Sequence, residues 1–225
     1  MNKTYGLLMS GEMIRAYKDK LKTETRRTRG LDEINESPDE WQFNGFSSET
    51  HRAIFQHASG RGVLIRPPYG WVGEDTLWFK EKYAVMCKEA DFGYCTCETE
   101  EEEKRNHYIE YGADTRNKYP GDWPEDEAKG NPDAPKWRSS MFMKHEYARF
   151  KNIQILDVKI QRLKDIVGID AFAEGYRALH PNLGVSGFDA VRWYFELWDK
   201  LNGKKLPAKV NPWVWVYQFK LLEAR

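Results

Sequence analysis

Alternating hydrophobic and polar positions predict four strands along this sequence. The clearest run covers residues 153–160, where apolar side chains recur at every second position except at one point. A half-buried strand with one bulge fits these apolar residues: Ile153, Ile155, Leu156, Val158 and Ile160. Similar patterns predict further strands over residues 4–9, 76–85 and 213–221.

A spacing of three to four residues predicts three helices. The first helix would place four apolar residues on one face against the core: Met13, Ile14, Tyr17 and Leu21. Ser10 precedes this run and is a candidate for the helix cap. Residues 169–179 and 189–201 predict two more helices, of which the second is strongly amphipathic.

Two long segments show neither period and are predicted to be peripheral insertions. Residues 30–62 are polar, with scattered Gly, Pro, Asn and Ser, and predict a loop with one short helix near residues 50–57. Residues 87–135 contain an acidic run with several Gly and Pro. Strands separated by helices and insertions, without a βα repeat, predict a single α+β domain over residues 1–225, built on a mixed β-barrel.

The charge balance limits the classes of function. Lys plus Arg equals Asp plus Glu at 35 each, so the whole molecule has no field that attracts nucleic acid from a distance, and any such contact requires a local patch. No apolar run approaches the roughly 20 residues that span a bilayer, and the first residues lack a signal-peptide pattern. We therefore expect a cytoplasmic protein that uses no membrane and no cofactor.

The cysteines support the same location. Cys87, Cys95 and Cys97 are an odd number within one segment, which is a poor disulfide framework and is typical of a reducing compartment. Together with His107 they offer four possible zinc ligands. The spacing lacks a C-x2-C knuckle, and the segment is acidic, so the pattern favours ordinary reduced cysteines and no metal.

Candidate chemistry begins at KTETRR, residues 22–27. A buried Lys22 would be a candidate base for the hydroxyl of Thr25. The two side chains share one side only if the preceding helix still coils at Lys22, because a strand would place them on opposite faces. The alternative is an ordinary charged helix exit. Glu174, within DAFAEG, has two interpretations as well, a site residue or a surface carboxylate on a helix.

A further candidate comprises residues 137–143 together with Arg149. In a nucleic-acid-binding segment, Arg138 and Arg149 would contact phosphate and Trp137 would stack on a base. In the alternative interpretation Trp137 and Met143 pack in the core and both arginines point into solvent. The sequence leaves both interpretations open.

Several of these segments together resemble the ASCH domain. The resemblance rests on KTETRR, on VGEDTLW at 72–78, on DAFAEG and on the closing WVWVYQF at 213–219. The longer stretches PPYGWVGEDTLWFKEKYA, KWRSSMFMKHEYARF and FELWDKLNGK are similar to ASCH proteins of phages and prophages. The matching segments cover about half of the chain and leave out residues 30–62 and 87–135. The resemblance implies a PUA-like β-barrel with flanking helices that binds RNA or nucleotides.

More distantly, the KTxTxR pattern is similar to the bacterial N4-acetylcytidine amidohydrolases, which use a Lys, a Thr and a Glu. This resemblance implies catalytic roles for Lys22, Thr25 and Glu174. Glu174 would hold or deprotonate Lys22, Lys22 would take the proton of Thr25, and Thr25 would attack the acyl carbon.

The leading hypothesis is a protein that handles a nucleobase or a modified nucleoside, with hydrolysis of N4-acylated cytidine as its activity. The candidate binding residues are the following: Thr23, Arg27, Trp71, Trp137, Arg138 and Arg149. One alternative is a non-catalytic RNA- or DNA-binding module. A second is a nuclease, which would require carboxylates ordered around a metal ion. The expected partner is a modified nucleoside or a nucleic acid.

Overall fold

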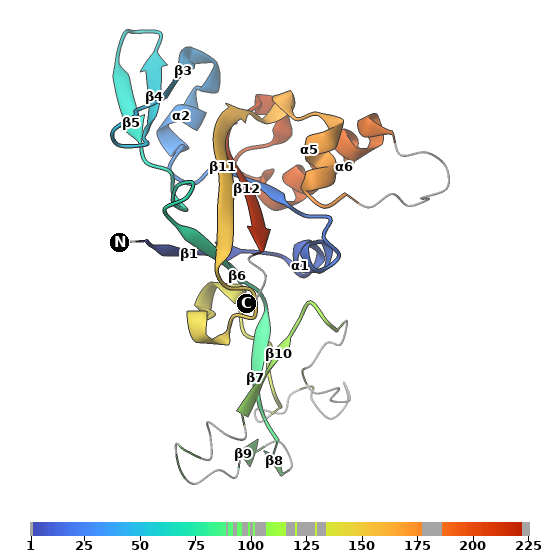
Figure 1. Ribbon diagram of the computed structural model, residues 1–225. Coiled ribbons are helices and arrows are strands. Elements are labelled where there is room, and N and C mark those ends of the chain that lie inside the picture. Colours follow the sequence, from blue (N-terminus) through green and yellow to red (C-terminus); the bar gives the residue numbers. More distant parts are fainter. Residues whose placement is uncertain are drawn as a thin grey trace. The chain divides into compact units, whose positions relative to one another are not determined.

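The computed structural model describes residues 2–88, 107–115, 134–176 and 186–221 (Figure 1). It also describes eight separate positions: 90, 91, 94, 95, 99, 101, 120 and 129. The chain divides into two compact units. Unit 1 comprises Met1–Tyr5, Ala16–Leu77 and Asn152–Arg225, and unit 2 comprises Gly6–Arg15 and Trp78–Lys151.

The largest sheet has five strands in the order β1-β6-β11-β12-β2. The strands are β1 Thr4–Leu8, β2 Glu24–Arg27, β6 Thr76–Lys80, β11 Ile153–Arg162 and β12 Trp213–Leu221. β11 is antiparallel to both β6 and β12, and β12 is antiparallel to β2. Thr76 N donates to Lys3 O, and Met9 N donates to Lys80 O, so β1 runs parallel to β6. The sheet is therefore mixed.

The meeting of β6, β11 and β12 in one sheet confirms the prediction of an α+β fold. The strand predicted over 76–85 is in fact two strands, because β7 (Tyr83–Cys87) pairs with β10 (His107–Tyr111) in a separate two-stranded sheet. Within the part of the chain that the structure describes, no sheet closes on itself, and the predicted barrel is not detected.

The predicted bulge in β11 lies at Leu156. The register against β12 shifts between Ile155 and Asp157, and the extra residue, Leu156, is 47% exposed. The shift keeps the apolar residues before and after it on one side of the strand. On that side four residues are buried: Ile153, Ile155, Val158 and Ile160. The bulge therefore explains why apolar and polar residues do not alternate strictly along β11.

Two helices cover the other side of the sheet. They are α5, Gly168–Ala173, and α6, Gly187–Asn202, and they pack on Val214 and Val216 of β12. The prediction of an amphipathic helix over 189–201 is thereby confirmed. A Cβ at Gly168 would lie 2.7 Å from the Cα of Gly187, so a side chain at Gly168 would push the two helices apart.

The segment 30–62 is not the loop that the sequence analysis predicted. It contains α2 (Asp32–Glu36) and most of a three-stranded antiparallel sheet. The strands of this sheet are β3 Trp41–Phe46, β4 Ala53–His57 and β5 Gly62–Ile65. β4 occupies the place of the predicted short helix, and its Phe55 is fully buried. Strands this short offer too few positions for alternation to be recognised. Figure 1 shows this sheet and α5 on opposite sides of β11 and β12.

The first helix is shorter than predicted. α1 covers Gly11–Lys18, and Ser10 Oγ accepts a hydrogen bond from Met13 N at 3.3 Å, which confirms Ser10 as a cap. The helix ends before Leu21 because Lys20 adopts a left-handed φ of 60° and the chain turns away.

Most of the segment 87–135 lies outside the described residues. Its described parts include β10, which pairs with β7, and the two-residue strands β8 (Ala90–Asp91) and β9 (Tyr94–Cys95). Among the helices that the structure describes, none has the length and apolar composition needed to cross a membrane.

Adjacent substitutions in β11 test the bulge. Ile155→Ala should lower the free energy of unfolding by about 2–5 kcal/mol, because it leaves a cavity in the core. Leu156→Ala should change it by no more than about 0.5 kcal/mol, because this side chain faces solvent. Urea denaturation measures both values. Similar losses for the two variants would show that Leu156 also packs in the core.

Candidate functional site

Local backbone geometry brings Glu174 against Lys22. After α1 the chain turns, and Lys22 forms an isolated antiparallel bridge with Glu174, the residue that follows α5. Gly175 has a φ of 103°, and a Cβ there would lie 2.9 Å from the Cβ of Ala16. Both facts require glycine at this position. The DAFAEG segment is thus shaped to hold its Glu beside a lysine 152 residues away in the sequence.

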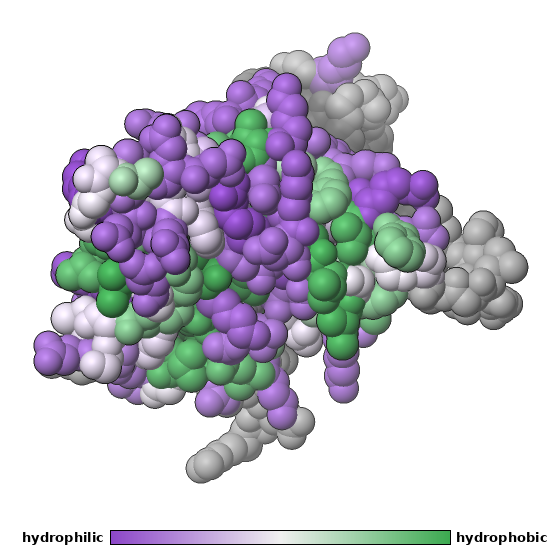
Figure 2. All heavy atoms as spheres, turned by 90° about the horizontal axis from the view of Figure 1, so that it is seen from above, coloured by the Kyte–Doolittle hydropathy of each residue, from purple (hydrophilic) through white to green (hydrophobic). Residues whose placement is uncertain are grey.

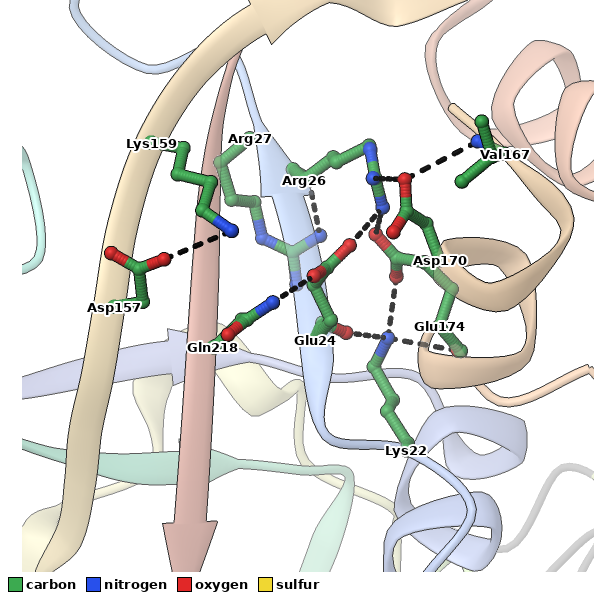
Figure 3. A network of polar contacts seen from close by, with 10 residues as sticks. All are labelled: Lys22, Glu24, Arg26, Arg27, Asp157, Lys159, Val167, Asp170, Glu174 and Gln218. Atoms are coloured by element: carbon green, nitrogen blue, oxygen red, sulfur yellow. Dashed lines mark hydrogen bonds and ion pairs between the residues drawn. The ribbon is translucent and has the colours of Figure 1, made fainter. Parts of the chain in front are cut away.

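The ammonium group of Lys22 is fully buried and fully hydrogen bonded (Figure 3). Its Nζ donates to Glu174 Oε2 at 2.7 Å, to Glu174 O at 3.0 Å and to Glu24 O at 2.8 Å. These three acceptors use all three N–H donors of the group. Burial lowers the pKa of Lys22, and the charge of Glu174 partly opposes this effect.

Arg26 joins the same group of charges. Its Nη1 lies 2.6 Å from Glu24 Oε1 and 3.1 Å from Glu174 Oε1, and its Nη2 lies 3.2 Å from Asp170 Oδ2. The guanidinium also lies over the ring of Tyr194, with 5.6 Å between its Cζ and the ring centroid. Burial opposes the charge on Arg26, but the surrounding anionic groups prevail and raise its pKa.

We call Lys22, Glu24, Arg26, Asp170 and Glu174 the ionic cluster. It contains two cations and three carboxylates, so one carboxylate lacks a matching cation within the cluster. Burial raises the pKa of Glu24, although the charge of Arg26 opposes this shift. The sequence analysis did not identify Arg26. Positions 22, 24 and 26 lie on one side of an extended chain, and this spacing of two is the signal from which Arg26 could have been predicted to lie beside Lys22.

Thr25 lies between two members of the ionic cluster but faces away from it. Successive side chains of a strand point to opposite sides, so Thr25 in β2 points away from Glu24 and Arg26. Thr25 is fully buried, and its Oγ1 has no hydrogen-bond partner among the described residues. The structure therefore brings together two of the three predicted catalytic residues, Lys22 and Glu174. The helical arrangement that would add Thr25 is absent because α1 ends at Lys18.

The other predicted residues of unit 1 lie at separate places. Thr23 is exposed, and its backbone N–H donates to Ala173 O. Arg27 is half-buried, and its Nη1 donates to Arg26 O at 3.2 Å. Trp71 is half-buried and stacks on His51, with the ring centroids 4.9 Å apart and an interplanar angle of 10°.

The predicted residues of unit 2 have partners within that unit. Arg149 binds Glu81 through two hydrogen bonds of 2.9 and 2.8 Å, and it also pairs with Asp114. The sequence analysis predicted that Arg149 contacts a phosphate of a nucleic acid. In the structure its guanidinium binds carboxylates instead. Arg138 is exposed and Met143 is buried, as the core interpretation of this segment expects, whereas Trp137 is only half-buried.

The structure does not test whether the cysteines bind zinc, because two of the three side chains lie outside the described residues. Cys87 is half-buried in β7, whereas Cys97 and the side chain of Cys95 lie outside the described residues. Among the side chains that the structure describes, no three of the types His, Cys, Asp and Glu are placed to hold a metal ion.

An apolar groove of about 690 Å³ lies along α5 and α6. Figure 2 shows apolar surface interspersed with hydrophilic residues on the face that it presents. Phe188, which lines the groove, is 89% exposed. None of the nine predicted site residues is among the residues that line it: Ile166, Val167, Gly168, Gly187, Phe188, Val191, Arg192, Phe195, Glu196 and Asp199.

No family, curated protein or solved structure matches the chain at a significant level.

Removing one charge from the central pair should be costly. Glu174→Gln leaves the buried Lys22 without its principal counter-charge, and we expect the free energy of unfolding to fall by about 3–5 kcal/mol. Glu196→Gln, an exposed change on α6, is the control and should cost no more than about 0.5 kcal/mol. Chemical denaturation at neutral pH compares them. Equal effects would mean that the pair is not buried in solution.

The raised pKa of Glu24 gives a stability effect with a definite sign. Between the ordinary value of 4.5 and the raised pKa, the folded protein binds more protons than the unfolded chain, so its stability falls as pH rises. Glu24→Gln removes this dependence. The stability of Glu24→Gln relative to the wild type should therefore increase as pH rises through this window and level off above it. Urea denaturation across the pH range measures this difference, and a decrease would contradict the assignment.

Proposed function

We propose that this chain is an ASCH-type protein that binds a nucleobase or a modified nucleoside. The observation that carries the proposal is the pairing of Lys22 with Glu174, at 2.7 Å, from the two motifs that resemble the ASCH family. A chance resemblance of two charged segments gives no reason for their side chains to meet in the interior. The pairing supports a common origin for the motifs, and with it the nucleobase-handling role.

The geometry favours binding over hydrolysis. A catalytic base must reach the group from which it takes a proton, and the Nζ of Lys22 is fully buried with all its donors engaged. The hydroxyl that it would activate, on Thr25, faces the other side of β2. In this arrangement the ionic cluster holds β2 in place, and the ligand binds on the opposite side of β2, which Thr25 faces.

Hydrolysis of an N4-acylated cytidine is the second candidate. Burial lowers the pKa of Lys22, and Glu174 lies beside it, which is an environment that can tune proton transfer. In the reaction, Thr25 Oγ would attack the acyl carbon, Lys22 would take the hydroxyl proton, and that proton would pass to the departing amine. Water would then release the acyl group from Thr25. This route requires a conformational change that brings Lys22 to Thr25.

A nuclease receives less support. The three carboxylates of the ionic cluster are grouped, but Lys22 and Arg26 already occupy them. A catalytic metal site needs carboxylates that are free to bind the ion.

The proposal also includes the closed form of the fold and the location of the protein in the cell. We infer a PUA-like barrel in which the mixed sheet β1-β6-β11-β12-β2 forms the principal part of the wall. The clustered cysteines support a cytoplasmic location.

The proposal predicts saturable binding of at least one nucleoside. A panel of cytidine, N4-acetylcytidine, other modified nucleosides and a short RNA should be titrated by calorimetry, with mass spectrometry of the recovered ligand. We expect binding with a 1:1 stoichiometry and an unchanged ligand mass. Loss of 42 Da from N4-acetylcytidine, roughly the mass of one acetyl group, would make hydrolysis the function, provided that Thr25→Ala abolishes it. No binding by any member of the panel would overturn the proposal.

A further inference from the structure

Two uncharged buried polar groups on neighbouring strands have no hydrogen-bond partner. They are Trp215 Nε1 in β12 and Thr25 Oγ1 in β2, and within the described part of the chain neither makes a hydrogen bond. Both residues are 0% exposed. An unsatisfied buried donor costs about 1–3 kcal/mol, and native proteins contain few such groups. Glu24 Oε1 and the Nε and Nη2 of Arg26, on the other side of β2, also make no hydrogen bond to a described residue, but their charges are paired. Thr25 and Trp215 are uncharged and therefore require a different explanation.

The strand register places these atoms on one side of the sheet. Thr25 lies opposite Tyr217, and Trp215 lies opposite Arg27. Thr25 and Trp215 are thus diagonal neighbours, with Cα atoms about 7–8 Å apart, a distance that one small planar molecule can bridge. This side is the one that faces away from Glu24 and Arg26, so the ionic cluster does not occupy it.

Aromatic rings cover the same side. Phe46 stacks on Trp215 with ring centroids 6.2 Å apart and an interplanar angle of 29°. Tyr69 packs edge-on against Tyr217 at 5.7 Å, and its backbone N–H donates to the hydroxyl of Tyr217 at 3.1 Å. Tyr217 is therefore satisfied, and the missing bonds are confined to the other two residues. We call Thr25, Phe46, Tyr69, Trp215 and Tyr217 the aromatic face.

We propose that the aromatic face is the nucleobase-binding site. A ring nitrogen or carbonyl oxygen of the base accepts a hydrogen bond from the N–H of Trp215, and the edge of the base forms a hydrogen bond with the hydroxyl of Thr25. Indole offers only a donor, whereas a hydroxyl both donates and accepts. The edge of a nucleobase presents such groups side by side. Flat aromatic walls suit a planar ring, since base-aromatic stacking contributes about 1–3 kcal/mol per base. This inference rests on the proposed function and deepens it.

The covering strand has a feature that allows entry. Phe46 follows a bulge in β3, where the register against β4 shifts between Phe43 and Phe46 and Gly45 has a φ of 103°. Phe46 and Tyr69 are only half-buried. β2 is an edge strand, so Thr25 belongs to the margin of the sheet. A ligand reaches the buried atoms when the ring of Phe46 moves aside at this bulge.

Thr25→Val and Trp215→Phe test the site, because each removes one unpartnered polar atom and keeps most of the apolar shape. Using the full chain and the nucleoside from the panel with the highest affinity, we expect each variant to bind at least about tenfold more weakly. Thr4→Val and Trp198→Phe are matched controls, because their polar atoms bond Thr76 Oγ1 and Leu206 O. Both controls should bind as the wild type does.

Stability without ligand separates a binding role from a structural one. Thr25→Val should unfold at the same temperature as the wild type or higher, because it removes a buried hydroxyl that makes no bond in the free protein. A clear fall in its melting temperature would mean that the hydroxyl is already bonded in the free protein, and would overturn the inference. Thr25→Ser, which keeps the hydroxyl, should retain binding.

The indole N–H signal of Trp215 in nitrogen–proton NMR spectra gives a direct readout, assigned through the signal lost in Trp215→Phe. Addition of the nucleoside should move this signal downfield as the N–H forms a hydrogen bond. If the nucleoside binds the wild type but neither this signal nor the affinity of the two variants changes, the aromatic face is the wrong site and the proposed function stands. If no nucleoside binds, both fail together.

Discussion

The burial of the Lys22 ammonium is the constraint on which the arrangement of unit 1 depends. A buried charge is tolerated only with an opposite charge and a full set of hydrogen bonds, and Lys22 obtains both from Glu174 and the carbonyl of Glu24. These contacts fix the end of α5 against the start of β2. Gly175 is the steric condition for that approach, since a side chain there would meet Ala16.

Strand β2 thereby separates two chemical environments. On one side, Glu24 and Arg26 belong to a network of ion pairs, in which Glu24 Oε1 and the Nε and Nη2 of Arg26 make no hydrogen bond within the described part of the chain. On the other, Thr25 faces aromatic residues and retains an unsatisfied hydroxyl. The first side has the properties of a structural brace, with every donor of Lys22 engaged. The second has the properties of a recognition surface, where unused hydrogen-bonding capacity is kept for a molecule that arrives later.

The sequence predicted those elements whose periodicity is long. β12 has the predicted bounds, 213–221, and α6 and β11 extend only slightly beyond theirs, because nine or more positions define a period clearly. Short strands were recognised less consistently: β1, of five residues, was predicted, but β3 to β5, of four to six residues each, were missed. For the site, motif resemblance predicted Lys22 beside Glu174. The opposite orientation of Thr25 depended on where α1 ends, and a single left-handed residue, Lys20, decides this.

The bulge in β11 also bears on how this chain can vary. The halves of the strand on either side of Leu156 are in different phases of the two-residue repeat, so each half is aligned with β12 independently. Deletion of Leu156 alone would leave a regular ladder in which the same apolar residues face the core, because Ile155 and Asp157 already lie opposite consecutive residues of β12. Any other single insertion or deletion within the strand would turn the apolar side chains of one half to the opposite face. The strand therefore tolerates a change in its length at this one position.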